Sequence, residues 1–260
     1  MNRPSRWALA MLWLALIFLI GPFMVVFVTG FGDGETMRFP PDHYGMRWFW
    51  HLLTVESFQR SFMTSLWVGL VSTSVALLLG VPVAYALSRH RSKALEWARN
   101  LLTLPLIVPG IIVGLALMDS LVLLYNLPVL ASLIVGHTAL LLPYTVRVVS
   151  SSLANLRVDI DDAAMTLGAT RLQAFFKVIL PNIRSGVAAA FILAFITSFN
   201  QVPVSLFLTG PGISTLPIEM MAYMETSYDP SIAALSTLLV LFTLLVVAAT
   251  EKLLGISQYV

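Results

Sequence analysis

Six runs free of Asp, Glu, Lys and Arg occupy most of this chain and restrict what it can fold into. The runs are Trp7–Gly32, Ser61–Ser88, Asn100–Met118, Ser120–Val146, Ser185–Ile218 and Pro230–Thr250. Each is long enough for a helix of roughly 20 residues, the length that crosses a bilayer core of about 30 Å. With 58% hydrophobic and 11% charged residues, the composition is typical of an integral membrane protein rather than a soluble domain.

We predict an all-α integral membrane protein that forms a single domain over residues 1–260. Helices are expected because every backbone N–H and C=O group in lipid needs a partner within the protein. The six predicted spans cover residues 7–31, 61–88, 101–125, 129–150, 185–208 and 231–251. The first run follows Arg3 and Arg6, as a signal peptide would, but it exceeds the roughly 7–15 apolar residues of such a segment. We therefore expect it to be retained as the first span.

Lysine and arginine are distributed unevenly between the loops. With the N-terminus inside, the outer segments hold only Arg38, Arg47 and Arg60, and the inner segments hold the other 12 of the 15 basic residues. An excess of positive charge on cytoplasmic loops is the usual orientation signal. Both termini are therefore expected in the cytoplasm, where the basic residues meet anionic lipid headgroups.

Some function classes are excluded by composition. The chain has no cysteine, which excludes disulfides and thiolate metal sites, and we predict no metal site. Basic residues do not form a stripe with interleaved aromatic residues, so nucleic-acid binding is also excluded.

A charged, helix-prone stretch, "DDAAMTLGATRLQAFFKVILP" at 161–181, separates the fourth and fifth predicted spans. Each half has apolar residues at helical spacing, and neither half can cross a membrane. These apolar residues are Ile160, Ala163, Ala164 and Leu167 in the first half, and Leu172, Phe175, Phe176 and Ile179 in the second. The stretch predicts two short amphipathic helices on the cytoplasmic side, within a loop at 155–183.

Local signals mark the ends of these two helices. Asp159 is the predicted cap of the first helix, and Gly168 can end it. Thr170 followed by Gln173 has the form of a capping box for the second helix, and Pro181 marks its end. The apolar surface is too small for a domain core, which favours a docking element over a loop lying on the inner leaflet.

This stretch resembles the EAA loop of binding-protein-dependent ABC importer permeases, whose pattern is E-A-A, three residues, G, nine residues, I-x-L-P. The chain has DAA at 162–164, Gly168 and VILP at 178–181. Asp162 and Val178 are conservative departures. The likeness extends through "FMTSLWVGLVSTSVALLLGVPVAYALSRHR", "LPLIVPGIIVGLAL" and "TLPIEMMAYMETSYDPSIAALSTLLV". These stretches are most similar to the second permease subunit of spermidine/putrescine-type importers.

The resemblance implies a type I ABC importer permease fold in the bacterial inner membrane. It implies a second homologous permease subunit, which would form a heterodimer with this chain, two cytoplasmic ATPase subunits and a periplasmic substrate-binding protein. The resemblance also implies which residues couple this chain to the ATPase. They are Asp162, Ala163, Ala164, Gly168, Ala169, Phe175, Leu180 and Pro181. The Walker-type loop G-x-x-x-x-G-K-[ST] does not occur in this sequence. ATP and Mg²⁺ are therefore expected on the ATPase partners, and this chain is expected to be a non-catalytic subunit without a cofactor.

Polar residues inside the predicted spans are the candidates for the substrate pathway. They are Asp119, Ser198, Asn200 and Gln201. An ionisable residue in a span indicates a functional site; the alternative for Asp119 is a position close to the outer interface, paired or hydrated. Unpaired amides in hydrocarbon are costly, so Asn200 and Gln201 are expected to face protein or water. Relatives often carry an aspartate and a glutamate where this chain has Asn200 and Gln201, which weakens the argument for a polyamine. His137 is either a partner of Asp119 or a core histidine.

Alternatives remain at this point. Within the importer family, ferric iron, phosphonates and opines compete with a polyamine as the substrate. A secondary transporter would carry coupling ions on intramembrane acids, and the chain shows only one clear candidate, Asp119. A membrane-embedded hydrolase would need a Ser/His or paired-carboxylate site, and no such spacing is recognisable.

Overall fold

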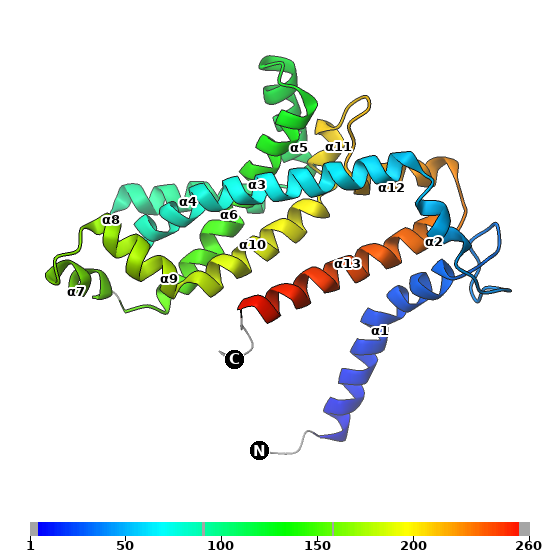
Figure 1. Ribbon diagram of the computed structural model, residues 1–260, viewed down its shortest axis with the longest axis horizontal. Coiled ribbons are helices and arrows are strands. Elements are labelled where there is room, and N and C mark those ends of the chain that lie inside the picture. The colour runs from blue at the N-terminus through cyan, green and yellow to red at the C-terminus, as the bar shows by residue number, and fades with distance from the viewer. Residues whose placement is uncertain (1–4, 90–91, 158, 255–260) are drawn as a thin grey trace. The chain divides into compact units, whose positions relative to one another are not determined.

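The computed structural model describes residues 5–89, 92–157 and 159–254, and every regular element in these ranges is helical (Figure 1). The chain divides into two compact units. Unit 1 combines Met1–Gln59 with Met220–Leu245, and unit 2 combines Arg60–Glu219 with Val246–Val260.

Unit 1 contains α1 (Arg6–Gly30), α2 (Arg47–Leu52), most of α12 (Leu216–Thr226) and much of α13 (Ser231–Leu254). Gly30 allows the end of α1 to approach α13, because a Cβ at Gly30 would lie 3.0 Å from the carbonyl oxygen of Ala233. Elsewhere α1 exposes its apolar side chains along its length. Such a surface is expected of a helix that faces lipid or another membrane helix.

The start of α13 is held by one carboxylate. Asp229 Oδ1 accepts the N–H of Ser231 at 2.9 Å, and Oδ2 accepts the hydroxyl of Tyr223 at 2.7 Å. The ring of Tyr223 in turn lies 4.9 Å from that of Phe58. These contacts tie α12 to α13 and to the first turn of α3 (Glu56–Arg89).

Unit 2 is built on α3, α6 (Val129–Ala154) and α10 (Arg184–Phe199), with α6 packed against α10. Its other elements are α4 (Lys93–Ile107), α5 (Gly110–Leu117), the π-helical η1 (Met118–Leu124), α7 (Ile160–Thr166), α8 (Arg171–Ala174), the π-helical η2 (Phe175–Ile179), α9 (Leu180–Asn182) and α11 (Ser205–Leu208). One core cluster of the described residues, called the main core cluster below, joins α3, α6 and α10. It is formed by Val81, Ala84, Leu87, Val146, Val149, Leu153, Ile179, Ile183 and Ala190.

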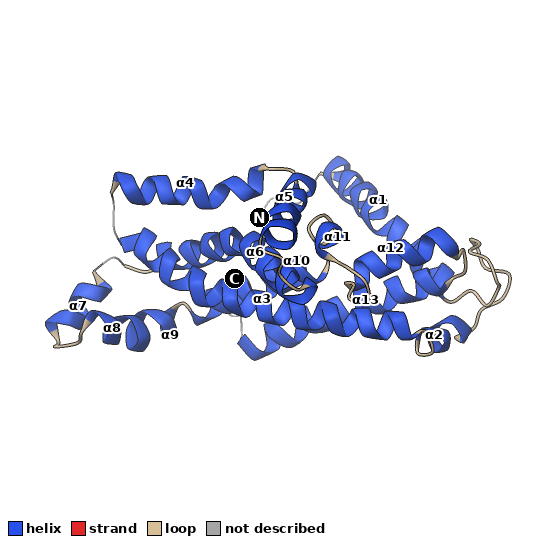
Figure 2. Cartoon of the chain, turned by 90° about the horizontal axis from the view of Figure 1, so that it is seen from above, coloured by secondary structure: helices blue, strands red, loops and turns tan. Residues whose placement is uncertain are grey.

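The third predicted span, 101–125, is interrupted. Helix α4 ends at Ile107, α5 begins at Gly110, and the two helices are bent by 103°. Figure 2 shows α5 nearly end-on while α4 lies in the plane of the view. Val108 has extended backbone angles (ψ 133°), because the ring of the following Pro109 clashes with a helical conformation at the preceding residue. Pro105 remains inside α4.

The fifth predicted span, 185–208, is interrupted as well. Helix α10 has 16 residues and ends at Phe199, so it is about 24 Å long at 1.5 Å per residue. Residues 200–204 are not helical, and α11 follows at Ser205. Gly114 of α5 fits closely against this break, because a Cβ there would lie 2.6 Å from the carbonyl oxygen of Pro203.

Length and composition identify four helices in the described residues that can cross a membrane. They are Trp7–Gly30, Glu56–Arg89, Val129–Ala154 and Ser231–Thr250. The number rises to six if each of two bent pairs, Lys93–Ile107 with Gly110–Leu124 and Arg171–Asn182 with Arg184–Phe199, counts as one span. The prediction of an all-helical, multi-span membrane protein is confirmed at this level.

Candidate functional site

Helices α7, α8 and α9, with η2, form the segment predicted to consist of two short amphipathic helices. Within the described residues this segment covers 159–183, and Figure 1 shows it at one end of unit 2. We refer to it as the coupling segment. Residues 171–182 form one nearly continuous helix, bent by 71° from α10.

Gly168 joins the two halves of the coupling segment in a left-handed conformation, with φ of +90°. Its N–H donates to the carbonyl of Met165 at 2.9 Å, and the N–H of Ala169 donates to the carbonyl of Ala164 at 3.1 Å. This pair of bonds is the Schellman motif that ends many helices. Apart from its own chain neighbours, no heavy atom of the described residues lies within 4 Å of a Cβ built at Gly168. Glycine is therefore required for its backbone angle and not for space.

The two predicted caps differ in outcome. Thr170 and Gln173 form the predicted capping box, with both reciprocal hydrogen bonds present. Asp159 is the N-cap residue of α7 as predicted, but its side chain makes no capping hydrogen bond. Instead Arg157 donates two hydrogen bonds to the Asp159 carboxylate, at 3.0 and 2.6 Å. These bonds lower the pKa of Asp159.

One face of the coupling segment packs on the body of unit 2. Ala164, Ala174 and Ile179 are buried, and Phe175 and Leu180 are partly buried against the main core cluster. Ala174 and Ile179 are five residues apart, which matches the π-helical geometry of η2. Two residues of each predicted apolar stripe are thus buried or partly buried, Ile160 and Ala164 in the first and Phe175 and Ile179 in the second.

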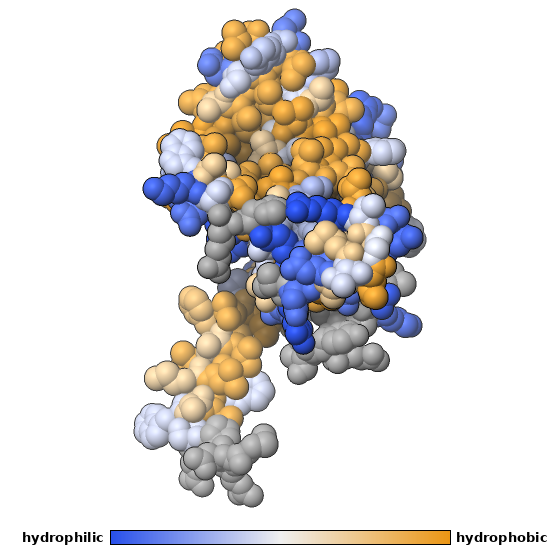
Figure 3. Space-filling view, turned by 90° about the vertical axis from the view of Figure 1, so that its left-hand side faces the viewer, coloured by the Kyte–Doolittle hydropathy of each residue, from blue (hydrophilic) through white to orange (hydrophobic). Residues whose placement is uncertain are grey.

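The opposite face of the coupling segment exposes the remaining apolar residues. Leu167, Leu172 and Phe176 are 89%, 71% and 59% exposed, and we call these three side chains the apolar patch. Asp162 and Ala163 are exposed too, as is Pro181, and Ala169 is half-buried. In Figure 3, which faces this end of the chain, hydrophilic residues in blue lie beside hydrophobic ones. An apolar patch with a polar surround is typical of a protein-binding surface.

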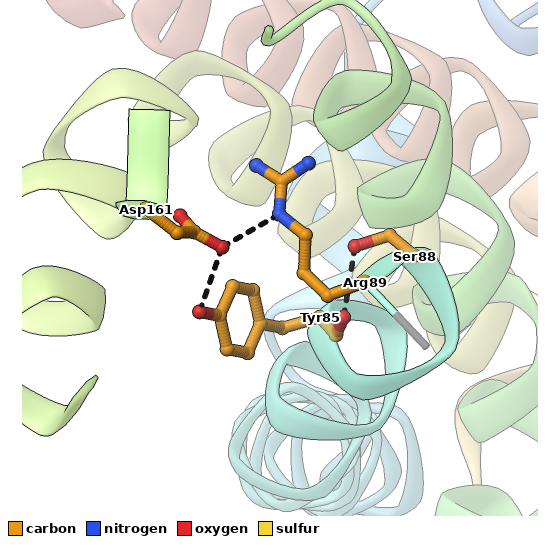
Figure 4. Close-up of polar contacts among 4 residues, drawn as sticks. All are labelled: Tyr85, Ser88, Arg89 and Asp161. Atoms are coloured by element: carbon orange, nitrogen blue, oxygen red, sulfur yellow. Dashed lines mark hydrogen bonds and ion pairs between the residues drawn. The ribbon is translucent and has the colours of Figure 1, made fainter. Parts of the chain in front are cut away.

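A buried ion pair, which the sequence did not reveal, fastens the segment to α3. Asp161 Oδ2 lies 2.9 Å from Nε of Arg89 and accepts the hydroxyl of Tyr85 at 3.0 Å (Figure 4). Ser88 Oγ donates to the carbonyl of Tyr85 within α3. The only signal in the sequence was a second acid directly before the motif acid Asp162, which by itself does not distinguish a buried acid from an exposed one.

The candidate pathway residues lie on two neighbouring elements. Asp119 is exposed on η1, which packs against α11. Asn200 is exposed and Gln201 is half-buried in the break before α11, and the Asn200 amide donates to the carbonyl of Ile196 at 3.1 Å. Among the described residues, no hydrogen bond or ion pair is found between Asp119 and either amide.

Ser198 has a different environment, because its hydroxyl is held by His137. The imidazole of His137 bonds Ser198 through Nδ1 at 2.8 Å and Ser205 through Nε2 at 3.0 Å. All three side chains are buried, with His137 only 1% exposed. His137 is therefore a core histidine that joins α6, α10 and α11, and it is not a partner of Asp119.

A cavity of about 1020 Å³ lies in unit 2 among the ends of α3 and α6 and the length of α4. Its charged lining residues are Arg89, Arg99, Arg147 and Glu96. Arg89 is already paired with Asp161, so Arg99 and Arg147 against Glu96 leave the lining with a small net positive charge. Such a lining fits an anion better than a cation.

Comparison with curated proteins finds relatives over most of the chain. The putrescine transport system permease protein PotI of Escherichia coli K12 is 29% identical over 242 residues, which cover 90% of this chain and 86% of PotI. The spermidine/putrescine permease PotC of the same strain is 29% identical over 236 residues, or 90% of this chain and 88% of PotC. The molybdenum permease ModB of Mycobacterium tuberculosis is 32% identical over 215 residues, or 76% of this chain and 81% of ModB.

Solved structures share the fold. A bacterial ABC transporter involved in the import of alginate aligns with a TM-score of 0.73 at 18% identity, over 97% of this chain and 99% of that chain. An inward-facing MetNI methionine ABC transporter aligns with a TM-score of 0.66 at 21% identity, over 80% of this chain and 96% of that chain. The model of the family described as "Binding-protein-dependent transport system inner membrane component" matches residues 76–254. This chain therefore belongs to that family of ABC importer permeases, as a non-catalytic membrane subunit.

Proposed function

We propose that this chain is one of two permease subunits of an importer that passes a polyamine, of the putrescine or spermidine class, into the cytoplasm. The observation that carries the substrate class is the similarity to PotI and PotC over 90% of the chain. The last outer segment also supports a cation, because Glu219, Glu225 and Asp229 occur there without lysine or arginine. Negative charge at a pathway entrance raises the local concentration of cations.

The proposed arrangement is a single membrane domain with six spans and both termini in the cytoplasm. The bent pair α4 and α5 with η1 would be the third span, and α10 with α11 the fifth. Partners would be a homologous permease subunit in a heterodimer, two ATPase subunits that bind ATP and Mg²⁺, and a periplasmic binding protein. The membrane would be the bacterial inner membrane.

We propose that the coupling segment docks on one ATPase subunit. The apolar patch would enter a cleft of the ATPase, with Asp162 and Ala163 at its edge and the Schellman turn at Gly168 setting the angle between the two halves. Ala164, Phe175 and Leu180 would fix the segment on unit 2, and Ala169 and Pro181 would bound its second helix. The exposure of Leu167, Leu172 and Phe176 outside any predicted span supports this role.

We propose that the break at 200–204 lies on the substrate pathway. Transporters commonly bind substrate where membrane helices are interrupted, because unwound backbone offers free carbonyl and N–H groups. Asn200, Gln201 and Asp119 would contact the solute, and Ser198 would hold the break in place through His137. The close fit of Gly114 against Pro203 would keep α5 beside this site.

An oxyanion is the second candidate substrate. Two observations favour it: the 32% identity to ModB and the arginine-lined cavity of unit 2. The amides at Asn200 and Gln201 are compatible with either charge, because an amide both donates and accepts hydrogen bonds.

The test begins with purification of the chain in mild detergent and identification of the proteins that accompany it. We expect a nucleotide-binding ATPase and a second permease subunit. The complete importer is then reconstituted in proteoliposomes with its binding protein, and uptake of labelled putrescine and of molybdate is measured with and without ATP. ATP-dependent putrescine uptake supports the proposal, and molybdate uptake alone replaces it with the oxyanion function. Recovery of the chain alone, active without ATP, would contradict both.

A further inference from the structure

Two adjacent acids in the coupling segment have opposite environments. Asp162, the acid of the family motif, is exposed. Asp161 is turned toward α3, where its side chain is 12% exposed and that of Arg89 is 8% exposed. Only Asp162 is therefore available to a docking partner, and Asp161 can act only within this chain.

Asp161 meets the last residue of α3. Arg89 Nε lies 2.9 Å from Asp161 Oδ2, and the same oxygen accepts the Tyr85 hydroxyl at 3.0 Å (Figure 4). Tyr85 and Asp161 are 76 positions apart in sequence, so these bonds connect α7 directly to a helix that is long enough to cross the membrane.

Tyr85 also contacts the second half of the segment. Its ring centroid lies 5.0 Å from that of Phe175 in η2, and both side chains pack against the main core cluster. A single side chain of α3 thus touches both halves of the coupling segment, one on each side of the Gly168 joint. The segment and the end of α3 are therefore connected at two points.

The ion pair is not arranged for maximal stability. Among the described residues, Arg89 Nε and Nη2 and Asp161 Oδ1 are buried without a hydrogen-bond partner. The 2.9 Å contact between Nε and Oδ2 is therefore an ion pair only, and it lacks the two parallel hydrogen bonds of an ideal arginine–carboxylate contact. Buried pairs of this kind often add little stability compared with apolar residues of similar volume. A pair that adds little stability can still fix one relative position of the two elements that it joins.

We propose that Arg89, Asp161 and Tyr85 are positioning residues that transmit movement of the coupling segment to α3. This inference rests on the proposed docking of the segment on an ATPase. When the ATPase displaces the segment, the ion pair and the tyrosine bond make α3 move with it. Without these contacts the segment still docks through its exposed face, but its movement no longer reaches α3.

The test uses the complete importer in proteoliposomes, with ATP hydrolysis and solute uptake measured in the same sample. In Arg89→Gln, solute imported per ATP hydrolysed is expected to fall about tenfold, which is within the usual range of coupling between two sites. The ATPase should still co-purify in normal amount. Tyr85→Phe keeps the ring contact with Phe175 and should give a smaller loss.

Two double variants separate positioning from folding. Arg89→Asp with Asp161→Arg restores opposite charges, and we expect it to recover at least half of the normal uptake per ATP. Arg89→Met with Asp161→Leu replaces the pair by apolar side chains, and it should keep the wild-type unfolding temperature while uptake per ATP stays low. Arg157→Gln is the matched control, since Arg157 precedes the coupling segment and forms an exposed ion pair with Asp159 at its start, and it should couple normally.

Normal uptake per ATP in Arg89→Gln would overturn the inference. So would a charge-swapped variant that assembles without regaining coupling, whether or not Arg89→Gln itself assembles. Failure of the docking proposal has a different signature, because polar substitution of the apolar patch would then leave ATPase binding unchanged. The Arg89 variants leave that patch intact.

Discussion

Single residues carry two separable roles in this permease, and Gly168 illustrates the first. With φ of +90° and open space around it, its function depends on backbone angle. The left-handed conformation costs a residue with a Cβ about 1–2 kcal/mol of conformational free energy. A bulky side chain would also change the exposed face beside Leu167.

We expect Gly168→Trp to abolish transport while the chain remains inserted in the membrane. Gly168→Asn is the matched control, because asparagine adopts left-handed backbone more readily than other residues with a side chain, and it should keep most activity. Uptake by the importer in proteoliposomes measures both variants. Normal uptake by Gly168→Trp would remove the docking role of this turn.

His137 illustrates the second role, which is internal. His137→Ala would leave the buried hydroxyls of Ser198 and Ser205 without their shared partner, at a cost of about 1–3 kcal/mol. We expect the purified complex to unfold at a lower temperature. The measurement is the change in tryptophan fluorescence as the sample is heated. Thr138→Ala should change it much less, since Thr138 bonds only a carbonyl of its own helix. Equal effects of the two variants would argue against the bridging role of His137.

Among the elements, the coupling segment presents a surface that can be tested without disturbing the core. Leu172→Ser should reduce the amount of ATPase that co-purifies by at least about tenfold, because an apolar anchor is lost from the interface. The unfolding temperature of the Leu172→Ser permease should not change, since Leu172 is 71% exposed. Leu53→Ser, at a side chain 61% exposed outside the segment, is the control and should bind ATPase normally.

The start of α13 should respond to pH. Burial raises the pKa of Asp229, but hydrogen bonds from Ser231 and Tyr223 outweigh burial and hold it below its ordinary value. A carboxyl with a lowered folded-state pKa stabilises the folded state above the unfolded-state pKa of about 3.9, and this stability is lost as pH falls through the folded-state value.

We therefore expect Asp229→Asn to lower the unfolding temperature by a constant amount from pH 8 to pH 5. The difference from wild type should shrink below about pH 4, as the wild-type carboxyl begins to be protonated. Thermal unfolding across this pH range is the measurement. A difference that grows on acidification would have the wrong sign for this explanation.

For the whole molecule, orientation in the membrane is the property that the positive-inside distribution predicts. The chain has no cysteine, so single cysteines can be introduced without a background. Thr36→Cys should react with an impermeant maleimide in intact spheroplasts, and Thr166→Cys should react only after permeabilisation. The reverse pattern would place the coupling segment outside and exclude an ATPase partner there.

Much of this protein follows from its sequence because the controlling signals are local. Long uncharged runs specify membrane helices, since hydrocarbon offers the backbone no other partner. Thr170, Gln173 and Gly168 specify their own turns through residues only a few positions away. The family motif at 162–181 could be recognised for the same reason, and the family assignment is confirmed.

Other features were decided only by the tertiary structure. The chain leaves the helix before Pro109, where α5 meets Pro203, and stays helical through Pro105. Half of each predicted apolar stripe, including Leu167 and Leu172, stays exposed. Tyr85 and Asp161 are 76 positions apart in sequence, and His137 and Ser198 are 61 apart. Periodicity describes which face of a helix is apolar, but it carries no information on which distant helix covers that face. Whether Asp161 or Asp162 is the buried acid therefore depends on α3.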